Sequence, residues 1–374
     1  MNILILSWRG PGHPNAGGAE TSTHQHAKGW VKAGHQVTLF TSYYKGAKEE
    51  ENIDGVRIVR QGSQIFGVHL RAFLWFTFKN RQKYDLVVDQ FHGIPFFTPL
   101  YVKVKKLAFI HEVTKEVWSL NPWSWPFNLM PTLIGTIFEP LIFKLLYRKI
   151  PFMTVSTSTK KDLIKWGIPK ENITVIHNGL EASVSKYSLS KEKKKTIVFL
   201  GALTKDKGIE DALKIFSIVD NTEDNFQFWI VGKGEPHYLE WLKLQTIKFK
   251  INDKVKFWGF VSEEKKFELL KRAHILINPS IREGWGLVVT EAARVGVPTV
   301  AFDVPGLRDS IIHGKTGILC KDQSIAALSK GILDLLKENK KYEKMSKAAY
   351  RWSRNFSWEK STKYSLELIK SIVS

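Results

Sequence analysis

Cysteine is almost absent from this 374-residue sequence, which contains only Cys320. No disulfide can therefore form within the chain, a usage that suits a reducing cytoplasm without requiring one. Hydrophobic residues make up 43% of the sequence, which is ample for packed cores and argues against a disordered chain. Because one core rarely grows past ~250–300 residues, the length predicts two domains.

Long uncharged apolar runs are also absent. The most apolar stretch, FNLMPTLIGTIFEPLIFKLLYRKIPF, begins at Phe127. Glu139, Pro140 and Lys144 interrupt it well short of ~18 uncharged residues. The first residues, MNILILSW, resemble a strand and lack the basic and apolar regions of a secretory signal peptide. We therefore expect no transmembrane segment and a cytoplasmic location.

Acidic residues are too few to balance the basic ones. The chain has 36 Asp and Glu residues against 56 Lys and Arg residues, a formal net charge of +20. Such a charge attracts polyanions. The lysines are spread along the chain, with one dense run, KEKKK, at 191–195. We interpret most of this charge as solvated surface. A patch facing an anionic membrane is the next interpretation, and nucleic-acid binding is the least favoured.

Short β-rich apolar runs alternate with segments whose apolar residues have helical spacing. The strand-like runs include NILILSW, DLVVDQF and LAFIHEV in the first half and TIVFLGAL, FQFWIVGKG and PTVAFDV in the second. This order predicts an α/β fold of βαβ units, with ligands at the carboxyl ends of parallel strands. The pattern restarts after a polar stretch at 181–195, so we expect two Rossmann-like domains and a final amphipathic helix. No G-x-G-x-x-G follows the first strand, which weakens an NAD or FAD function.

The segment IREGWGLVVTEAARVGVP, which begins at Ile281, predicts a loop followed by a helix. Gly284 and Gly286 allow a tight loop and close approach of a ligand. A helix should begin near Leu287 and end before Pro298. Its free N–H groups would form a site for a diphosphate.

Two carboxylates flank this predicted anion site. Glu291 lies one turn into the helix and leans toward its N-terminus, where its two oxygens would suit a ribose diol. Glu283 lies on the loop and could hold the hydroxyls of a second sugar. The spacing alone is explained equally well by an ordinary helix carboxylate and a solvated loop carboxylate.

The motif E-G-[aromatic]-G-L-x-x-x-E, with a helix ending before G-x-P, resembles the retaining GT-B glycosyltransferases of family 4. Similar motifs occur in order along most of the chain: GGAE at 17–20, TVSTSTK at 154–160, VIHNGL at 175–180, FLGALTKDKGIEDAL at 199–213, WGFVSEEKKFELLKRA at 258–273 and VAFDVPGLRDSIIHGKTGIL at 300–319. Each motif is weak alone, but their order and spacing are specific. The resemblance implies a GT-B fold, two Rossmann-like domains facing across a cleft. Residues 1–185 with a returning C-terminal helix, 357–374, would form the acceptor domain, and 186–356 the donor domain.

The resemblance also implies roles for individual residues. Lys207 would neutralise the donor diphosphate, Glu283 would bind the transferred sugar, and His111 would contact that sugar. From its position at a strand end, His111 could equally be a capping residue. Further donor contacts would come from the glycine loop, the nucleobase position, the ribose carboxylate and the helix start: Gly17, Gly18, Val261, Gly284, Trp285, Gly286, Leu287, Val288 and Glu291.

One departure and one absence bear on the mechanism. The family usually carries an arginine where this sequence has Ala202, and Lys205 could share the diphosphate charge in its place. No Asp-x-Asp motif occurs in the chain to hold a metal ion, so we expect no metal cofactor. The lysine and the helix N-terminus would then stabilise the leaving diphosphate of a nucleotide-sugar donor. The resemblance implies a retaining transferase, and a hexosyltransferase is expected.

The acceptor is predicted from an aromatic-rich stretch of the first domain, with Trp118, Trp123, Trp125 and Phe127. Tryptophan favours the membrane–water interface, and KVKK at 103–106 and YRK at 147–149 could meet lipid phosphates. An ordinary packed loop beside a buried helix is the other interpretation. The expected acceptor is a glycan or a lipid-linked molecule, with the protein on the inner face of the cell membrane. A nucleotide-sugar epimerase and a non-catalytic basic module for membrane surfaces or nucleic acid remain as alternatives.

Overall fold

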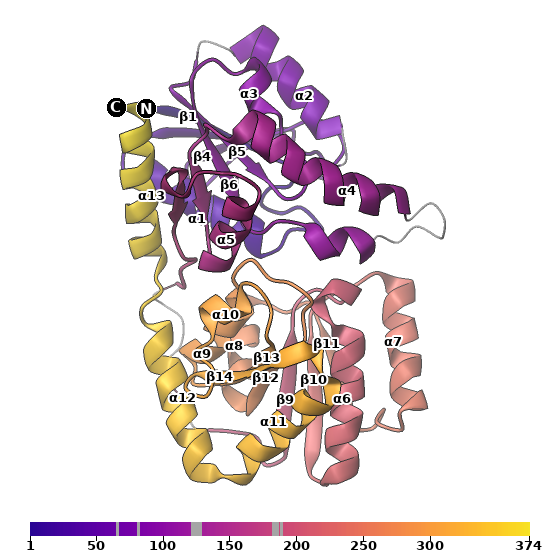
Figure 1. The fold of residues 1–374 in the computed structure, drawn as a ribbon. Helices are drawn as coiled ribbons and strands as arrows, with labels where there is room; N and C mark the ends of the chain where they lie inside the picture. Colours follow the sequence, from indigo (N-terminus) through magenta and orange to yellow (C-terminus); the bar gives the residue numbers. More distant parts are fainter. Residues whose placement is uncertain (65–66, 81–82, 121–128, 182–186, 188–189) are drawn as a thin grey trace. The chain divides into compact units, whose positions relative to one another are not determined.

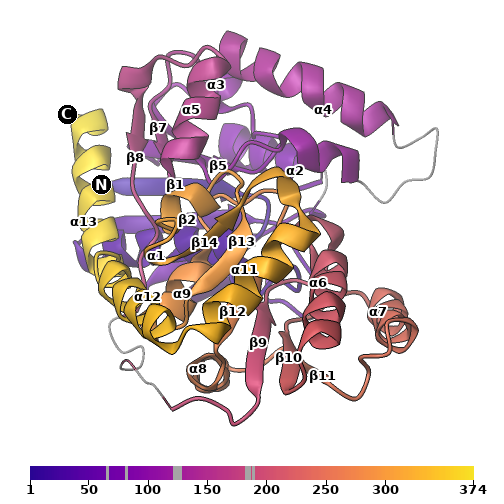
Figure 2. The same ribbon diagram turned by 60° about the horizontal axis from the view of Figure 1, so that its bottom comes forward.

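The computed structural model describes the whole chain except residues 65–66, 81–82, 121–128, 182–186 and 188–189. The chain forms two compact units. The first comprises Met1–Gly179 and Ser357–Ser374, and the second comprises Leu180–Phe356. Each unit has one largely or wholly parallel sheet covered by helices (Figures 1 and 2). This architecture confirms the predicted α/β fold with two Rossmann-like domains.

The first unit is built on an eight-stranded sheet of order β3-β4-β2-β1-β5-β6-β7-β8, in which only the β3–β4 pair is antiparallel. Its strands are β1 (Asn2–Ser7), β2 (Gln36–Thr41), β3 (Glu50–Ile53), β4 (Val56–Arg60), β5 (Leu86–Phe91), β6 (Lys105–Ile110), β7 (Phe152–Thr154) and β8 (Ile173–Val175). Its helices are α1 (Gly18–Lys32), α2 (Gly67–Trp75), α3 (Thr98–Tyr101), α4 (Leu129–Ile142), α5 (Thr157–Lys165) and α13 (Trp358–Val373). Shorter 3₁₀ or π segments are η1 (Phe76–Asn80), η2 (Lys115–Leu120), η3 (Phe143–Tyr147) and η4 (Lys170–Asn172).

The second unit is built on a six-stranded, fully parallel sheet of order β11-β10-β9-β12-β13-β14. Its strands are β9 (Lys195–Leu200), β10 (Phe226–Val231), β11 (Val255–Gly259), β12 (Ile275–Asn278), β13 (Thr299–Phe302) and β14 (Gly317–Cys320). Its helices are α6 (Ile209–Thr222), α7 (Pro236–Lys248), α8 (Glu263–Arg272), α9 (Leu287–Arg294), α10 (Leu307–Ser310), α11 (Ile325–Lys337) and α12 (Asn339–Ser353), with η5 (Lys205–Lys207) and η6 (Lys321–Gln323) as 3₁₀ turns. Helix α11 lies beside α6, and α8 lies beside α9 (Figure 2).

The continuous apolar runs of the sequence become central strands. In β1, residues Ile3 to Leu6 are almost completely buried, and the strand pairs in parallel with β2 and β5. A parallel sheet has helices on both faces, so its central strands need apolar side chains pointing both ways. This requirement explains why these strands lack the alternation of polar and apolar residues.

Helix α13 returns to the first unit and packs on α1. The Ser365 hydroxyl lies 2.9 Å from Nδ1 of His26 and accepts a hydrogen bond from Nε1 of Trp30 at 3.0 Å. Gly29 of α1 makes this contact close, because a Cβ there would lie 2.6 Å from Thr362. The expected return of the C-terminal helix is therefore confirmed.

Helix α4 differs from the expectation. It continues through Pro140 into η3, and the combined helix Leu129–Tyr147 is long and apolar enough, by length and composition only, to cross a membrane. The prediction treated Glu139 and Pro140 as breaks. Glu139 is instead buried, and its carboxylate accepts hydrogen bonds from Thr114 N at 3.1 Å and Trp118 Nε1 at 2.8 Å.

Candidate active site

The loops after β9 and β12 bring Lys207 and Glu283 together in the second unit. Nζ of Lys207 lies 3.0 Å from Oε1 of Glu283, and the Ser280 hydroxyl donates to the same oxygen at 2.9 Å. The backbone also joins the two loops, because Ile281 N donates to Asp206 O at 2.9 Å. The predicted sugar carboxylate and the predicted diphosphate lysine are thus direct neighbours, although they are 76 positions apart in the sequence.

Two glycines permit this arrangement. Gly208 ends the lysine turn with φ of 74°, and a Cβ there would lie 2.1 Å from Pro279 O. Gly286 is the residue before α9, with φ of 79° and ψ of 63°, a left-handed conformation that glycine adopts at little cost. The helix starts at Leu287 as predicted, and its first N–H groups lie at the end that favours an anion.

The remaining predicted donor residues differ in how far they are buried. Trp285 is 2% exposed and packs edge-on against Phe356, so its ring belongs to the core. Gly284 and Gly286 are buried, whereas Leu287, Val288 and Val261 are partly exposed. Lys205 is exposed at the start of η5. Both Lys205 and Lys207 belong to this turn, at its first and last positions.

Glu291 has a partner that the sequence did not predict. Its Oε1 lies 2.8 Å from Nζ of Lys266 on α8. Burial raises the pKa of Glu291, and the charge and hydrogen bond of Lys266 oppose that shift. A contact between two helix surfaces has no signature in the spacing of either helix, which explains why it was missed.

In the first unit, His111 follows β6 and is 5% exposed. Its ring lies against Phe109, and its carbonyl accepts a hydrogen bond from Thr159 Oγ1 at 3.0 Å. Burial lowers the pKa of His111 to about 3, with His92 and His26 adding to the shift. The imidazole is therefore neutral near pH 7. Its Nε2 has no hydrogen-bond partner among the described residues.

The glycine loop leads directly into α1. Gly17 precedes the helix, and its N–H donates to Oε2 of Glu20 at 2.7 Å, while Gly18 is the first helical residue. The other oxygen of Glu20 pairs with Nε of Arg9 at 2.9 Å. The carboxylate thus joins the start of α1 to the end of β1.

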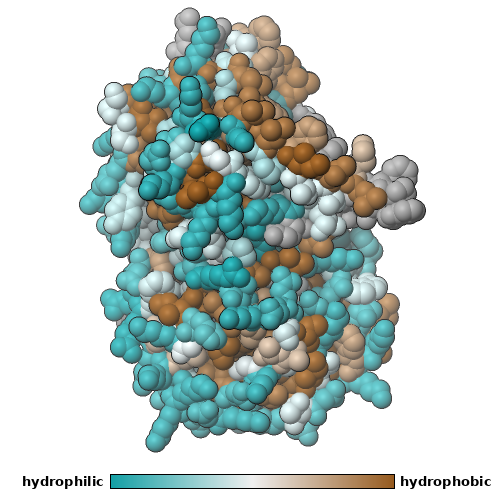
Figure 3. All heavy atoms as spheres, viewed as in Figure 1, coloured by the Kyte–Doolittle hydropathy of each residue, from teal (hydrophilic) through white to brown (hydrophobic). Residues whose placement is uncertain are grey.

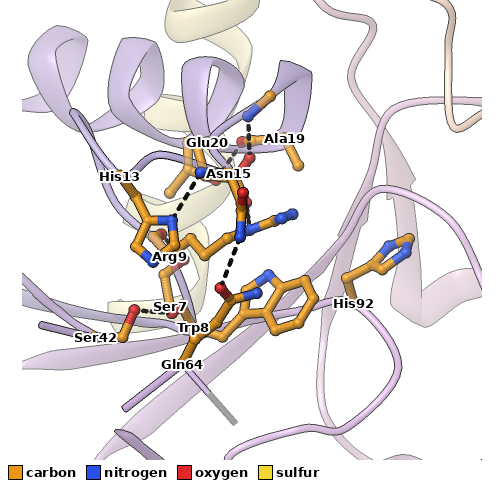
Figure 4. A network of polar contacts seen from close by, with 12 residues as sticks. Ser7, Trp8, Arg9, His13, Asn15, Ala19, Glu20, Ser42, Gln64 and His92 are labelled. Atoms are coloured by element: carbon orange, nitrogen blue, oxygen red, sulfur yellow. Dashed lines mark hydrogen bonds and ion pairs between the residues drawn. The ribbon is translucent and has the colours of Figure 1, made fainter. Parts of the chain in front are cut away.

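Sequence reasoning missed the polar cluster around this loop (Figure 4). The guanidinium of Arg9 lies 4.3 Å from the centre of the Trp8 ring. The rings of His92 and Trp8 are stacked, with 6.2 Å between their centres. Trp8 and Arg9 follow β1, and His92 follows β5. The rule that ligands gather at the carboxyl ends of parallel strands would have indicated these positions.

The aromatic stretch is only partly described. Trp123, Trp125 and Phe127 lie outside the described residues. The ring of Trp118 lies over Gly135, where a Cβ would come within 2.2 Å of it, and its indole N–H is bound to Glu139. Trp118 therefore ties α4 to the loop after β6.

No group of three or more His, Cys, Asp or Glu side chains that could hold a metal ion occurs among the described residues.

Two units, each built on a largely or wholly parallel sheet, are the architecture that the resemblance to the GT-B glycosyltransferases implied. Two family models match the chain, "Glycosyltransferase Family 4" over residues 16–184 and "Glycosyl transferases group 1" over residues 183–352. Together they span residues 16–352, and the chain belongs to family 4 of the glycosyltransferases.

The chain is similar to individual proteins of known name. It is 28% identical to a glycogen synthase of Mycobacterium tuberculosis over 213 residues, which are 55% of this chain and 50% of that protein. The chain thus matches about half the length of that relative. The structure of sucrose-phosphate synthase from Thermosynechococcus elongatus has a TM-score of 0.81 at 18% identity, covering 99% of this chain and 98% of that one. The Anabaena protein HepE in complex with UDP-glucose has a TM-score of 0.77 at 17% identity, covering 99% and 100%. These structural likenesses show the shared fold.

Proposed function

We propose that the protein is a retaining, metal-independent hexosyltransferase that moves a sugar from a nucleoside diphosphate sugar to a glycan or lipid-linked acceptor. The contact between Lys207, Glu283 and Ser280 beside the N-terminus of α9 carries this proposal. There a cation, a carboxylate and the N-terminus of α9 lie together beyond the carboxyl ends of the central strands β9 and β12. The structure of HepE in complex with UDP-glucose supports this class of donor.

The proposed reaction depends on stabilising the negative charge of the leaving diphosphate. When the bond between the sugar and the diphosphate breaks, negative charge accumulates on the diphosphate. Lys207 and the first N–H groups of α9 would bind that charge more tightly in the transition state than in the ground state. Glu283, which now accepts bonds from Lys207 and Ser280, would exchange part of this contact for hydroxyls of the transferred sugar. In this mechanism a phosphate oxygen of the donor takes the proton of the acceptor.

Binding of the donor can be tested first. The unfolding midpoint of the protein should rise with UDP-glucose, or with another sugar nucleotide of a panel carrying UDP, GDP and ADP, because a ligand that binds only the folded state stabilises it. Release of free sugar or transfer to an added acceptor would then exclude the non-catalytic basic module. If no sugar nucleotide changes the midpoint and none is consumed, the proposed function is wrong.

Metal independence gives a separate expectation. Full activity should remain after dialysis against excess EDTA, because Lys207 and α9 neutralise the leaving group without a cation. The initial rate of donor consumption, compared before and after chelation, measures this. Loss of activity that magnesium or manganese restores would contradict the proposed role of the lysine.

We also propose peripheral attachment to the cytoplasmic face of the membrane through α4. This helix and η3 expose seven large apolar side chains between 42% and 68%: Leu129, Met130, Leu133, Ile137, Phe138, Leu141 and Leu145. Figure 3 shows a hydrophobic band over α4. Lys144, Arg148 and Lys149 stand at its C-terminal end. Because Glu139 points inward to Trp118, the outward side presents apolar groups beside cations, as anionic lipid requires.

Vesicle sedimentation tests this attachment. Anionic vesicles should sediment the wild type at low salt, neutral vesicles much less, since each basic residue near the surface contributes about 1 kcal/mol and salt screens it. A Leu133→Ser, Ile137→Ser double variant should stay in the supernatant, and so should a Trp123→Ser, Trp125→Ser variant. The matched control is Leu244→Ser, Ile247→Ser on α7, whose side chains are 61% and 60% exposed. Equal sedimentation of the α4 and α7 variants would contradict the assignment to α4.

A further inference from the structure

Among the described residues, Lys266 of α8 donates the only hydrogen bond to the side-chain carboxylate of Glu291. The two side chains are mostly buried, at 12% and 16% exposure, and their charged atoms are 2.8 Å apart. Lys266 also contacts Glu263 at 2.7 Å, but that carboxylate is 73% exposed. Helices α8 and α9 pack together here, so the ion pair joins these two helices.

Lys266 favours the ionised form of Glu291 against the effect of burial. Burial raises the pKa of this carboxyl and Glu263 adds to the shift, whereas Lys266 opposes both. The elements packed against α9 are α8, α10, α12, β12 and β13. Among their described charged groups, Lys266 is the one that lowers the pKa of Glu291. Arg308 on α10 is paired with Asp303 instead, at 2.5 Å.

The pair also determines the direction of the carboxylate. Lys266 holds Oε1, and the described residues give Oε2 no hydrogen bond. One oxygen of Glu291 is therefore fixed by the protein, and the other is available as an acceptor. A ribose diol needs such an acceptor, and its hydrogen bonds are stronger to an ionised carboxylate than to a neutral carboxyl.

We propose that Lys266 is a positioning residue for the nucleotide: it holds Oε1 of Glu291 so that the carboxylate presents Oε2 to the ribose hydroxyls. This inference depends on the proposed function, because it assumes that Glu291 meets a nucleotide. It adds Lys266, a residue of α8, to a donor site whose two carboxylates, Glu283 and Glu291, lie on the loop before α9 and on α9 itself. The competing explanation is that the pair only fastens α8 to α9.

The effect of pH separates these two explanations. In a Lys266→Met variant nothing opposes the effect of burial, so Glu291 keeps its proton up to a higher pH than in the wild type. As the pH falls, nucleotide binding by this variant should therefore begin to weaken at a higher pH than binding by the wild type. A pair that merely joins two helices would change stability and leave the pH dependence of binding unaltered.

The test is calorimetric titration with UDP, or with GDP or ADP if the wild type binds one of these instead, at about pH 8 and about pH 6. Relative to the wild type, Lys266→Met should bind about 10-fold more weakly at the higher pH and about 100-fold more weakly at the lower one. Lys266→Arg keeps a cation and should stay within about 3-fold at both values. The matched control is Lys265→Met, which removes the neighbouring lysine, bound to Glu268 at 2.8 Å on the same helix.

Each outcome has one meaning. A larger loss at the lower pH in Lys266→Met alone supports the positioning role. Binding by Lys266→Met equal to that of Lys265→Met overturns it, as does an equal loss at both pH values accompanied by a lower unfolding midpoint. If the wild type binds none of the three nucleotides, the proposed function fails first, and this inference fails with it.

Discussion

Replacing Lys207 with methionine is expected to lower kcat for sugar transfer by about 100- to 1000-fold. This is the usual effect of removing one group that stabilises a developing negative charge. Nζ of Lys207 is held by Glu283 at 3.0 Å, so the cation is already in place before the donor arrives. Methionine keeps the apolar part of the side chain and removes the charge. The loss should therefore appear mainly in kcat, with a smaller change in KM.

Lys205→Met is the control for this variant. Lys205 lies on the same 3₁₀ turn but is exposed, so its removal should lower kcat by less than about 10-fold. Steady-state rates of both variants with the same sugar nucleotide measure the difference. Equal losses would show that the turn acts through its overall charge, and a small loss in both would contradict the assignment of the diphosphate to Lys207.

The periodicity of the sequence was sufficient to predict the central strands, because these are buried on both faces and therefore form continuous apolar runs. The start of α9 was also predictable. Gly286 adopts a left-handed conformation that only a few residue types tolerate, and the helical spacing begins directly after it. In both places one local requirement of the backbone or of burial determines the residue type.

Contacts between distant elements could not be predicted in this way. In the sequence Lys266 is one of three lysines in EEKKFELLKR at 263–272, and only the packing of α8 on α9 brings it to Glu291. Glu139 appeared to break an apolar helix, because the pattern cannot show that Thr114 and Trp118 supply it with hydrogen bonds. A charged residue in an apolar run is tolerated when the fold supplies its partners, and those partners are not its neighbours in sequence.

Gly306→Ala is expected to abolish most of the transfer activity by displacing Glu283. Gly306 has φ of 80°, and a Cβ there would lie 2.1 Å from the carbonyl oxygen of Glu283 and 2.6 Å from its carbonyl carbon. Backbone atoms cannot move aside as a flexible side chain can, so the loop that carries Glu283 must shift. A displacement of about 1 Å at a positioning group can cost about 100-fold in rate.

Gly314→Ala separates the steric effect from the conformational one. Gly314 also has a positive φ, 72°, but nothing lies within 4 Å of its Cβ position. Both variants lose the conformational freedom of glycine, which costs about 1 kcal/mol of unfolding free energy. Only Gly306→Ala adds the clash, which should cost about 1–3 kcal/mol more and lower kcat by at least about 100-fold. Urea unfolding and initial rates measure the two effects separately, with far-ultraviolet circular dichroism to verify that each variant is folded. If folded Gly306→Ala transferred sugar as fast as Gly314→Ala, the position of the Glu283 backbone would not limit the reaction. The assignment of the Glu283 carboxylate to the transferred sugar would then be wrong.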